Sequence, residues 1–269
     1  MPFIALEKAR LHYQRFGEGE RVILAFHGYG QDSSHFATMA EALRPTCSLF
    51  AFDLFFHGKS KLPKSKTPLQ KSFLAELIRD FLLERNIGRF SVMAFSMGGK
   101  FALSLIEAFP GQIDQVLLVA PDGIKTNFWY SMATYPGWMQ GLFKRTVLRP
   151  APFFRFVNFL DRHKIVDKGL LRFANWHMES TPKRLRIYRS WMGFSTLNFD
   201  IRKIVRLLNE NRIDMYLFLG EYDQVIPQRS LQVFIRALET GRVILLKTGH
   251  TYLLYEVASY LRQHKELFR

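Results

Sequence analysis

The chain contains the segment Ser91-Val92-Met93-Ala94-Phe95-Ser96-Met97-Gly98-Gly99-Lys100-Phe101-Ala102-Leu103, in which an apolar run leads into a serine and two glycines. We expect a strand over 90–95 and a helix over 97–108, joined by a sharp turn at Ser96. Such a turn lifts a serine hydroxyl clear of the backbone, which suits a nucleophile. Taken alone, the segment also fits a serine that only caps a helix.

Small residues surround Ser96 for a steric reason. Ala94 and Gly98, two residues before and two after the serine, face each other across the turn, so neither can be bulky. Gly99 lets the new helix pack against a neighbouring strand without a side chain between them. The usual pattern of such turns is Gly-x-Ser-x-Gly, and this chain has Ala-x-Ser-x-Gly.

Two later apolar runs end close to an acid and a histidine. The predicted strand 213–219 is followed by Asp223, and the predicted strand 243–247 is followed by His250. With Ser96 first, the order along the chain is nucleophile, acid and histidine, each just past the end of a strand.

This order resembles that of the α/β-hydrolase superfamily, and the resemblance covers nearly the whole chain. It implies an α/β-hydrolase fold, a mostly parallel sheet flanked by helices, with an inserted helical cap. We expect His250 to take the Ser96 proton as general base and Asp223 to orient the imidazole. Asp122, just past the predicted strand 113–120, is the rival for the acid, because a few members of the superfamily place it there.

An oxyanion hole is expected at two backbone amides. The Met97 amide lies at the first turn of a helix, where N–H groups favour an anion. By resemblance, the second amide is that of Tyr29, after the predicted strand 21–26. Gly28 and Gly30 would let that loop bend toward the serine, and His27 is expected to fix the loop through side-chain hydrogen bonds.

A further loop departs from the pattern of the superfamily. Asp53-Leu54-Phe55-Phe56-His57-Gly58-Lys59-Ser60 resembles an Asp-x-x-Gly-His-Gly-x-Ser motif, but Phe56 stands where glycine is usual. His57 is expected to have a structural role. Because Phe56 replaces the usual glycine, the sequence does not predict the backbone conformation of this loop.

Strand and helix patterns alternate up to about residue 122 and resume at about 206. We therefore expect residues 1–122 and 206–269 to form an α/β-hydrolase core and residues 123–205 to form a helical cap insertion. Prolines 136, 150 and 152 should break the insertion into short helices and turns.

The predicted insertion is basic and aromatic. Residues 124–206 hold 16 Lys and Arg against 4 Asp and Glu, within a chain of net charge +15, and they contain all four tryptophans, Trp129, Trp138, Trp176 and Trp191. Three interpretations stay open: the aromatic residues line an apolar pocket, the surface contacts an anionic membrane, or it attracts an anionic carrier or substrate. We expect no nucleic-acid partner, since no recognition motif accompanies the charge.

Composition indicates a cytoplasmic enzyme, with a peripheral place at a membrane surface left open. The 269 residues are 48% hydrophobic, which allows one sizeable core, yet no run is long and apolar enough to span a bilayer. The start lacks a signal-peptide layout, and the single Cys47 is compatible with a reducing compartment. Because no Cys/His cluster has metal-ligand spacing, we expect neither metal nor cofactor.

The serine narrows the expected chemistry to acyl transfer. We expect hydrolysis of an ester or thioester of an apolar acyl or aryl substrate through an acyl-serine intermediate. A C–C bond hydrolase or related lyase of the same fold is the first alternative. A catalytically silent hydrolase fold that serves as a binding protein is the second.

Overall fold

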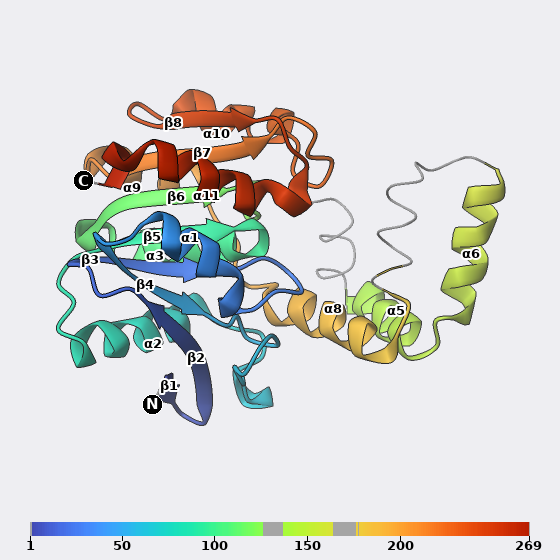
Figure 1. Ribbon diagram of the computed structural model, residues 1–269. Coiled ribbons are helices and arrows are strands. Elements are labelled where there is room, and N and C mark those ends of the chain that lie inside the picture. Colours follow the sequence, from blue (N-terminus) through green and yellow to red (C-terminus); the bar gives the residue numbers. More distant parts are fainter. Residues whose placement is uncertain (1, 126–136, 164–175, 177, 269) are drawn as a thin grey trace. The chain divides into compact units, whose positions relative to one another are not determined.

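The computed structural model describes residues 2–125, 137–163, 176 and 178–268 (Figure 1). The chain divides into two compact units. The first, here the core unit, comprises Met1–Lys66, Gln70–Lys125 and Leu197–Arg269, and the second, the insert unit, comprises Thr67–Leu69 and Thr126–Thr196.

The core unit is built on one sheet, to which the described residues contribute eight strands in the order β1-β2-β4-β3-β5-β6-β7-β8. Their bounds are β1 Phe3–Leu6, β2 Ala9–Phe16, β3 Arg21–Phe26, β4 Cys47–Phe52, β5 Phe90–Phe95, β6 Ile113–Val119, β7 Asp214–Gly220 and β8 Arg242–Leu246. Strands β3 to β8 pair in parallel, and β1 and β2 add an antiparallel edge. The mostly parallel sheet predicted from the sequence is confirmed.

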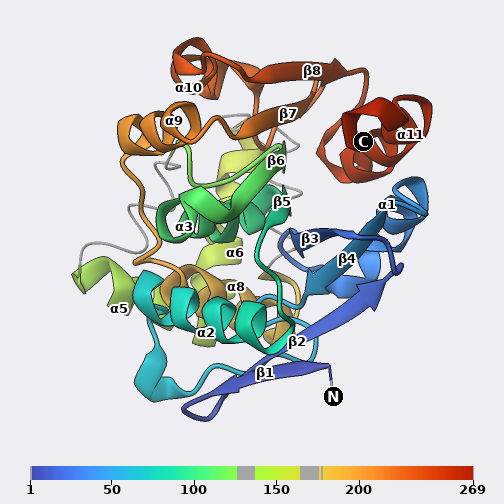
Figure 2. The same ribbon diagram turned by 90° about the vertical axis from the view of Figure 1, so that its left-hand side faces the viewer.

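Helices cover both faces of this sheet (Figure 2). On one face lie α1 (Ala37–Ala42) and α11 (Leu253–Gln263), and on the other lie α2 (Lys71–Glu84), α3 (Gly99–Ala108), α9 (Ile201–Glu210) and α10 (Gln232–Ala237). Because both faces are covered, β4 and β5 are buried at every residue and show no alternation of polar and apolar side chains.

Aromatic packing fixes α3 against the sheet. The Phe26 ring of β3 lies 5.4 Å from the Phe52 ring of β4 and 5.7 Å from the Phe101 ring of α3, and all three rings are fully buried. Aromatic contacts of this kind add about 0.5–1.5 kcal/mol each to the burial of their surface. They hold the start of α3 against the ends of β3 and β4.

The insert unit contains α5 (Gly137–Leu148), α6 (Ala151–Arg162) and α8 (Thr181–Gly193). Arg184 of α8 donates hydrogen bonds to the carbonyls of Val147 and Met178, at 2.9 Å each, and so ties α8 to the end of α5. Pro150 is the N-cap residue of α6 and Pro152 lies in its first turn, so these prolines do separate two short helices. Trp129 and Pro136 lie outside the described residues.

Candidate active site

The turn after β5 has the strained backbone that a nucleophile elbow requires. Ser96 adopts φ +50°, a left-handed conformation that a non-glycine residue seldom takes. Its carbonyl accepts a hydrogen bond of 2.8 Å from the Asp122 amide, which helps to hold this conformation. A turn of three residues, Ser96–Gly98, then leads into α3.

Backbone groups crowd the two glycines of the turn. A Cβ on Gly98 would lie 2.0 Å from the carbonyl oxygen of Phe26, and one on Gly99 would lie 2.5 Å from that of Asp122. Gly99 therefore allows close packing, but its partner is the segment after β6 rather than the neighbouring strand that the sequence predicted. The restriction on Gly98 comes from the end of β3.

Three side chains from the ends of β5, β7 and β8 meet at one edge of the sheet. The Ser96 Oγ lies 3.0 Å from the Nε2 of His250, and the Nδ1 of the same ring lies 2.7 Å from the Oδ2 of Asp223. The carboxyl ends of parallel strands share an edge, which explains how residues 154 positions apart come together. The structure thus brings the predicted Ser-His-Asp set within hydrogen-bonding distance.

Asp223 is fixed on both of its oxygens. Its Oδ1 accepts hydrogen bonds from the amides of Val225 and Ile226, at 2.8 and 2.9 Å, and its side chain is fully buried. Because a carboxylate only accepts hydrogen bonds, a neutral His250 ring that bonds to Asp223 carries its hydrogen on Nδ1, and its Nε2 can then accept one. That tautomer is the one that can accept the serine proton.

Asp122, the rival acid, has other partners. Its carboxylate accepts a hydrogen bond of 2.7 Å from the Gly123 amide. It also acts electrostatically on Lys100, which lies one helical turn after the serine and donates to the Leu197 carbonyl at 3.3 Å. Burial lowers the pKa of Lys100, and the charge of Asp122 opposes that shift in part.

Phe95 was not singled out from the sequence. Its buried ring stacks on the His250 imidazole with centroids 5.0 Å apart and planes 30° apart. It also packs on the loop after β3, since a Cβ on Gly28 would lie 2.9 Å from its Cδ1. In the sequence, Phe95 is visible only as the aromatic residue before Ser96. An aromatic residue at the end of a strand is ordinarily part of the core, so the sequence alone did not indicate a contact with His250.

The loop after β3 is held by a buried histidine. The Nδ1 of His27 donates to the Gly28 carbonyl at 2.7 Å, and its Nε2 accepts from the Leu54 amide at 2.9 Å. Burial and the neighbouring His57 lower the pKa of His27 from 6.5 to about 3, so the ring is neutral. The Gly28 amide donates to Oε1 of Gln31 at 3.0 Å.

Gly30 and Tyr29 complete this loop. Gly30 adopts φ +79°, so it is one of the positions where glycine is needed. The Tyr29 ring meets the His57 ring edge-on at 5.4 Å. Met97 is the second residue of the turn Ser96–Gly98, and N–H groups at the start of a helix have no partner within it.

A buried carboxylate organises the loop after β4. The Asp53 oxygens accept from the Ser33 amide at 2.8 Å and the Lys59 amide at 2.7 Å, and they lie 2.8 Å from His12. Burial alone would raise the pKa of Asp53, but these hydrogen bonds outweigh it and lower the pKa below 3.8. Phe56 adopts φ +69° in this loop, so it keeps the backbone conformation for which glycine is usual.

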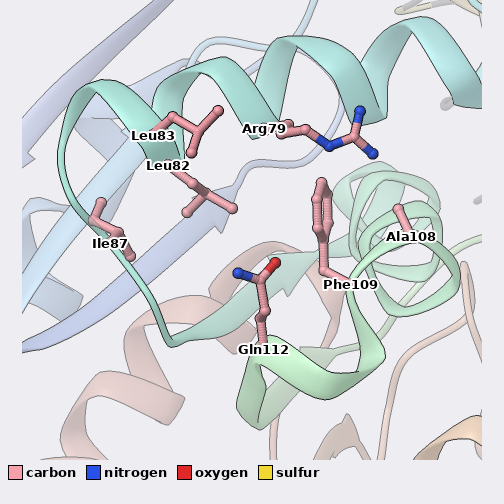
Figure 3. Close-up of a pocket in the computed structure, with 7 residues that line it drawn as sticks. All are labelled: Arg79, Leu82, Leu83, Ile87, Ala108, Phe109 and Gln112. Atoms are coloured by element: carbon pink, nitrogen blue, oxygen red, sulfur yellow. The ribbon is translucent and has the colours of Figure 1, made fainter.

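A separate pocket of about 350 Å³ lies between α2 and the end of α3 (Figure 3). Its lining residues include Ile87, before β5, and Phe109, before β6. It therefore lies toward the amino ends of these strands, whereas Ser96 follows the carboxyl end of β5. Among the described residues, no group of three His, Cys, Asp or Glu side chains is arranged to hold a metal ion.

The family model described as the alpha/beta hydrolase fold matches residues 21–257 of the chain. The chain therefore belongs to the α/β-hydrolase family, as its sheet order and its serine turn had indicated.

Solved structures share the fold across nearly the whole chain. An enol-lactonase from Burkholderia xenovorans is 18% identical with a TM-score of 0.67, each chain being covered to 98%. An esterase from Thermogutta terrifontis is 14% identical (TM-score 0.69, covering 99% of this chain and 97% of that one). A meta-cleavage product hydrolase from Pseudomonas fluorescens is 15% identical (TM-score 0.66, 99% and 96%).

Curated relatives match over a shorter range. A Mycobacterium tuberculosis protein of uncharacterised function is 26% identical over 138 residues, which are 51% of this chain and 40% of that protein. A Mycoplasma pneumoniae protein provisionally designated an esterase/lipase is 26% identical over 121 residues, 45% of this chain and 43% of its own length. The chain thus spans about two fifths of the curated relatives it matches.

No helix in the described part of the chain combines the length and the apolar character that crossing a membrane requires.

Proposed function

We propose that the protein is a serine hydrolase that cleaves an ester or thioester through an acyl-serine intermediate. One observation carries this proposal: the chain of contacts from the Ser96 Oγ through His250 to Asp223, at 3.0 and 2.7 Å. A serine hydroxyl is a weak nucleophile at neutral pH, and a base within hydrogen-bonding distance activates it.

The reaction follows from the tautomer of His250. The Ser96 Oγ attacks the substrate carbonyl while its proton passes to Nε2, and Asp223 stabilises the imidazolium that forms. His250 then gives this proton to the leaving alcohol or thiol as its bond to the carbonyl carbon breaks. A water molecule then attacks the acyl carbon while its proton passes to the same nitrogen. His250 returns this proton to the Ser96 Oγ as the bond from Oγ to the acyl carbon breaks and the acid leaves.

The backbone supplies the charge stabilisation that this route requires. The amides of Met97 and Tyr29 are the proposed donors to the oxyanion. Removal of one such donor typically costs a factor of 10²–10³ in turnover. Phe95 is a positioning residue in this scheme, because its ring packs on both the imidazole of His250 and the loop that contains Tyr29.

An apolar acyl or aryl group is the proposed substrate. The aromatic residues concentrated in the proposed cap, residues 123–205, favour such a group over a polar one. The division predicted from the sequence, a core of 1–122 and 206–269 and a cap of 123–205, places these residues in the insertion. The insert unit of the structure has narrower bounds, Thr126–Thr196 with Thr67–Leu69.

A series of p-nitrophenyl esters of rising acyl length tests the function. We expect turnover that rises from acetate to a longer acyl chain, and a loss on the order of 10⁴–10⁶ in kcat for Ser96→Ala and for His250→Ala. Retention of a tenth of the activity in either variant would reject the assignment.

Two other outcomes identify the alternatives. Activity on a carbon–carbon bond beside a ketone, with the folded wild type inert on every ester, would indicate a C–C hydrolase. Inertness on both substrate classes would favour a binding protein with a silent hydrolase fold.

A further inference from the structure

One exposed stripe of α5 combines apolar and cationic side chains. Trp138 and Leu142 are 71% and 50% exposed, and Arg145 and Arg149 are exposed as well. These four residues follow a spacing of 4, 3 and 4, which places them along one side of a helix. The Arg149 amide bonds to the Arg145 carbonyl at 2.8 Å, so the helical course continues to the end of this stripe.

The next helix repeats this combination. Phe156 and Phe159 of α6 are 59% and 52% exposed, while Val157 between them is buried. Arg155 and Arg162 are exposed on the same helix, and the helical period places them beside the exposed phenylalanines. A single exposed apolar side chain is ordinary on a protein surface, but a group of them on two consecutive helices is typical of an interaction surface.

The charge of the insert unit is one-sided. Its described residues include nine Lys and Arg and two acidic residues, Asp161 and Glu179. A surface of this sign attracts an anionic partner.

We propose that the exposed stripes of α5 and α6, here the insertion face (Trp138, Leu142, Arg145, Arg149, Arg155, Phe156, Phe159 and Arg162), bind the surface of an anionic lipid membrane. Tryptophan, phenylalanine and leucine enter the boundary between headgroups and acyl chains, while arginine reaches the phosphates from a flexible stem. An acidic protein would satisfy the arginines and leave the exposed aromatic rings without an apolar partner. The proposal does not depend on catalytic activity.

Tryptophan fluorescence offers a direct readout, because all four tryptophans lie at positions 129–191. We expect a blue-shifted emission and co-sedimentation when the full chain meets vesicles of phosphatidylcholine with phosphatidylglycerol. Neutral phosphatidylcholine vesicles should give neither effect, and high salt should weaken both.

Two matched triple variants separate local charge from net charge. Replacing Arg145, Arg149 and Arg155 by glutamine should weaken binding roughly 100-fold, since each basic residue near an anionic surface contributes about a factor of five. The control replaces Arg229, Arg236 and Arg262, three exposed arginines of the core unit, by glutamine as well. It removes the same charge and should change the affinity for the vesicles less than threefold. Equal losses in the two variants would overturn the proposal.

A third variant tests insertion. Trp138→Ser with Phe156→Ser keeps every charge and, because both side chains are exposed, should keep the fold. We expect it to lose at least tenfold in vesicle affinity. Two results would overturn the lipid proposal and assign the face to an acidic polymer. One is that this variant binds anionic vesicles as tightly as the wild type does, and the other is that the wild type binds polyglutamate as tightly as it binds the vesicles.

Discussion

At the scale of single residues, two aspartates compete for the same role, and their contacts differ. Asp223 lies 2.7 Å from the His250 Nδ1 and is held by two amides, whereas Asp122 accepts from the Gly123 amide and faces Lys100. An acid that orients the imidazole must contact it. The contacts therefore favour Asp223.

Exchanging each carboxylate for an amide tests this assignment. Asp223→Asn should lower kcat on an ester by a factor on the order of 10⁴, because an amide at this position favours the wrong histidine tautomer. Asp122→Asn should leave kcat of the folded enzyme within tenfold, although it removes the countercharge of Lys100. The measurement is steady-state turnover on one p-nitrophenyl ester. The reverse ranking of the two variants would make Asp122 the acid.

Chain order and strand ends, read together with the resemblance to the α/β-hydrolase superfamily, predicted that Ser96, Asp223 and His250 would be close. In a parallel sheet the carboxyl ends of the strands lie at the same edge, so residues that follow different strands lie near one another even when they are far apart in the sequence. Phe95 and Lys100 could not be found this way. Phe95 looks like an ordinary member of an apolar strand and Lys100 like an ordinary surface lysine of a helix, and the contacts of both depend on which loops pack beside them.

At the scale of elements, the turn after β5 depends on close backbone packing. The sequence predicts one helix over 97–108, but the chain first makes the turn Ser96–Gly98 and enters α3 only at Gly99. The difference arises because Gly98 packs under the Phe26 carbonyl at the end of β3, a contact absent from the local sequence. A similar break at Leu231 separates the short turn Gln228–Ser230 from α10 (Gln232–Ala237).

Two glycine-to-alanine variants test this packing. Gly98→Ala should lower the free energy of unfolding by about 3 kcal/mol, because the new methyl group meets a backbone carbonyl that cannot rotate away. Gly111→Ala is the control, since a Cβ there has nothing within 4 Å, and its effect should stay within about 0.5 kcal/mol. Urea titrations of both proteins measure the difference. Equal stability of the two variants would contradict the packing that we describe.

At the scale of the whole molecule, the pH dependence of stability should carry the signature of His27. Its pKa of about 3 in the folded chain lies below the 6.5 of an exposed histidine. Between these values the unfolded chain binds the proton and the folded chain does not. Stability is therefore complete above pH 6.5 and is lost as the pH falls toward 3.

The expected size of this effect is about 2 kcal/mol between pH 7 and pH 5. Asp53 also stabilises the fold above its lowered pKa, but its contribution is lost only below 3.8, outside this window. The His27→Gln variant lacks the titrating group. From pH 7 to pH 5, the free energy of unfolding of the wild type should therefore fall by about 2 kcal/mol more than that of the variant. Parallel curves for the two proteins would show that His27 is not held neutral.

The sequence predicted the sheet and its alternation with helices because a buried parallel strand and an amphipathic helix have local patterns. Such patterns place Cys47 and Leu117 on buried strands and Phe81 on the apolar side of a helix, and all three residues are buried in the core. The insertion was harder to interpret, since short helices of mixed aromatic and basic residues fit a pocket lining, a lipid surface and a surface for an anionic carrier or substrate. Exposure of individual side chains on α5 and α6 was needed to favour the lipid surface.

Covalent labelling of Ser96 tests the central claim most directly. A fluorophosphonate probe should add to the folded wild type, and mass spectrometry should find the adduct on the peptide that contains Ser96. Labelling should vanish in Ser96→Ala and fall by several orders of magnitude in rate in His250→Ala. A folded wild type that takes no label, or an adduct on another residue, would contradict the account.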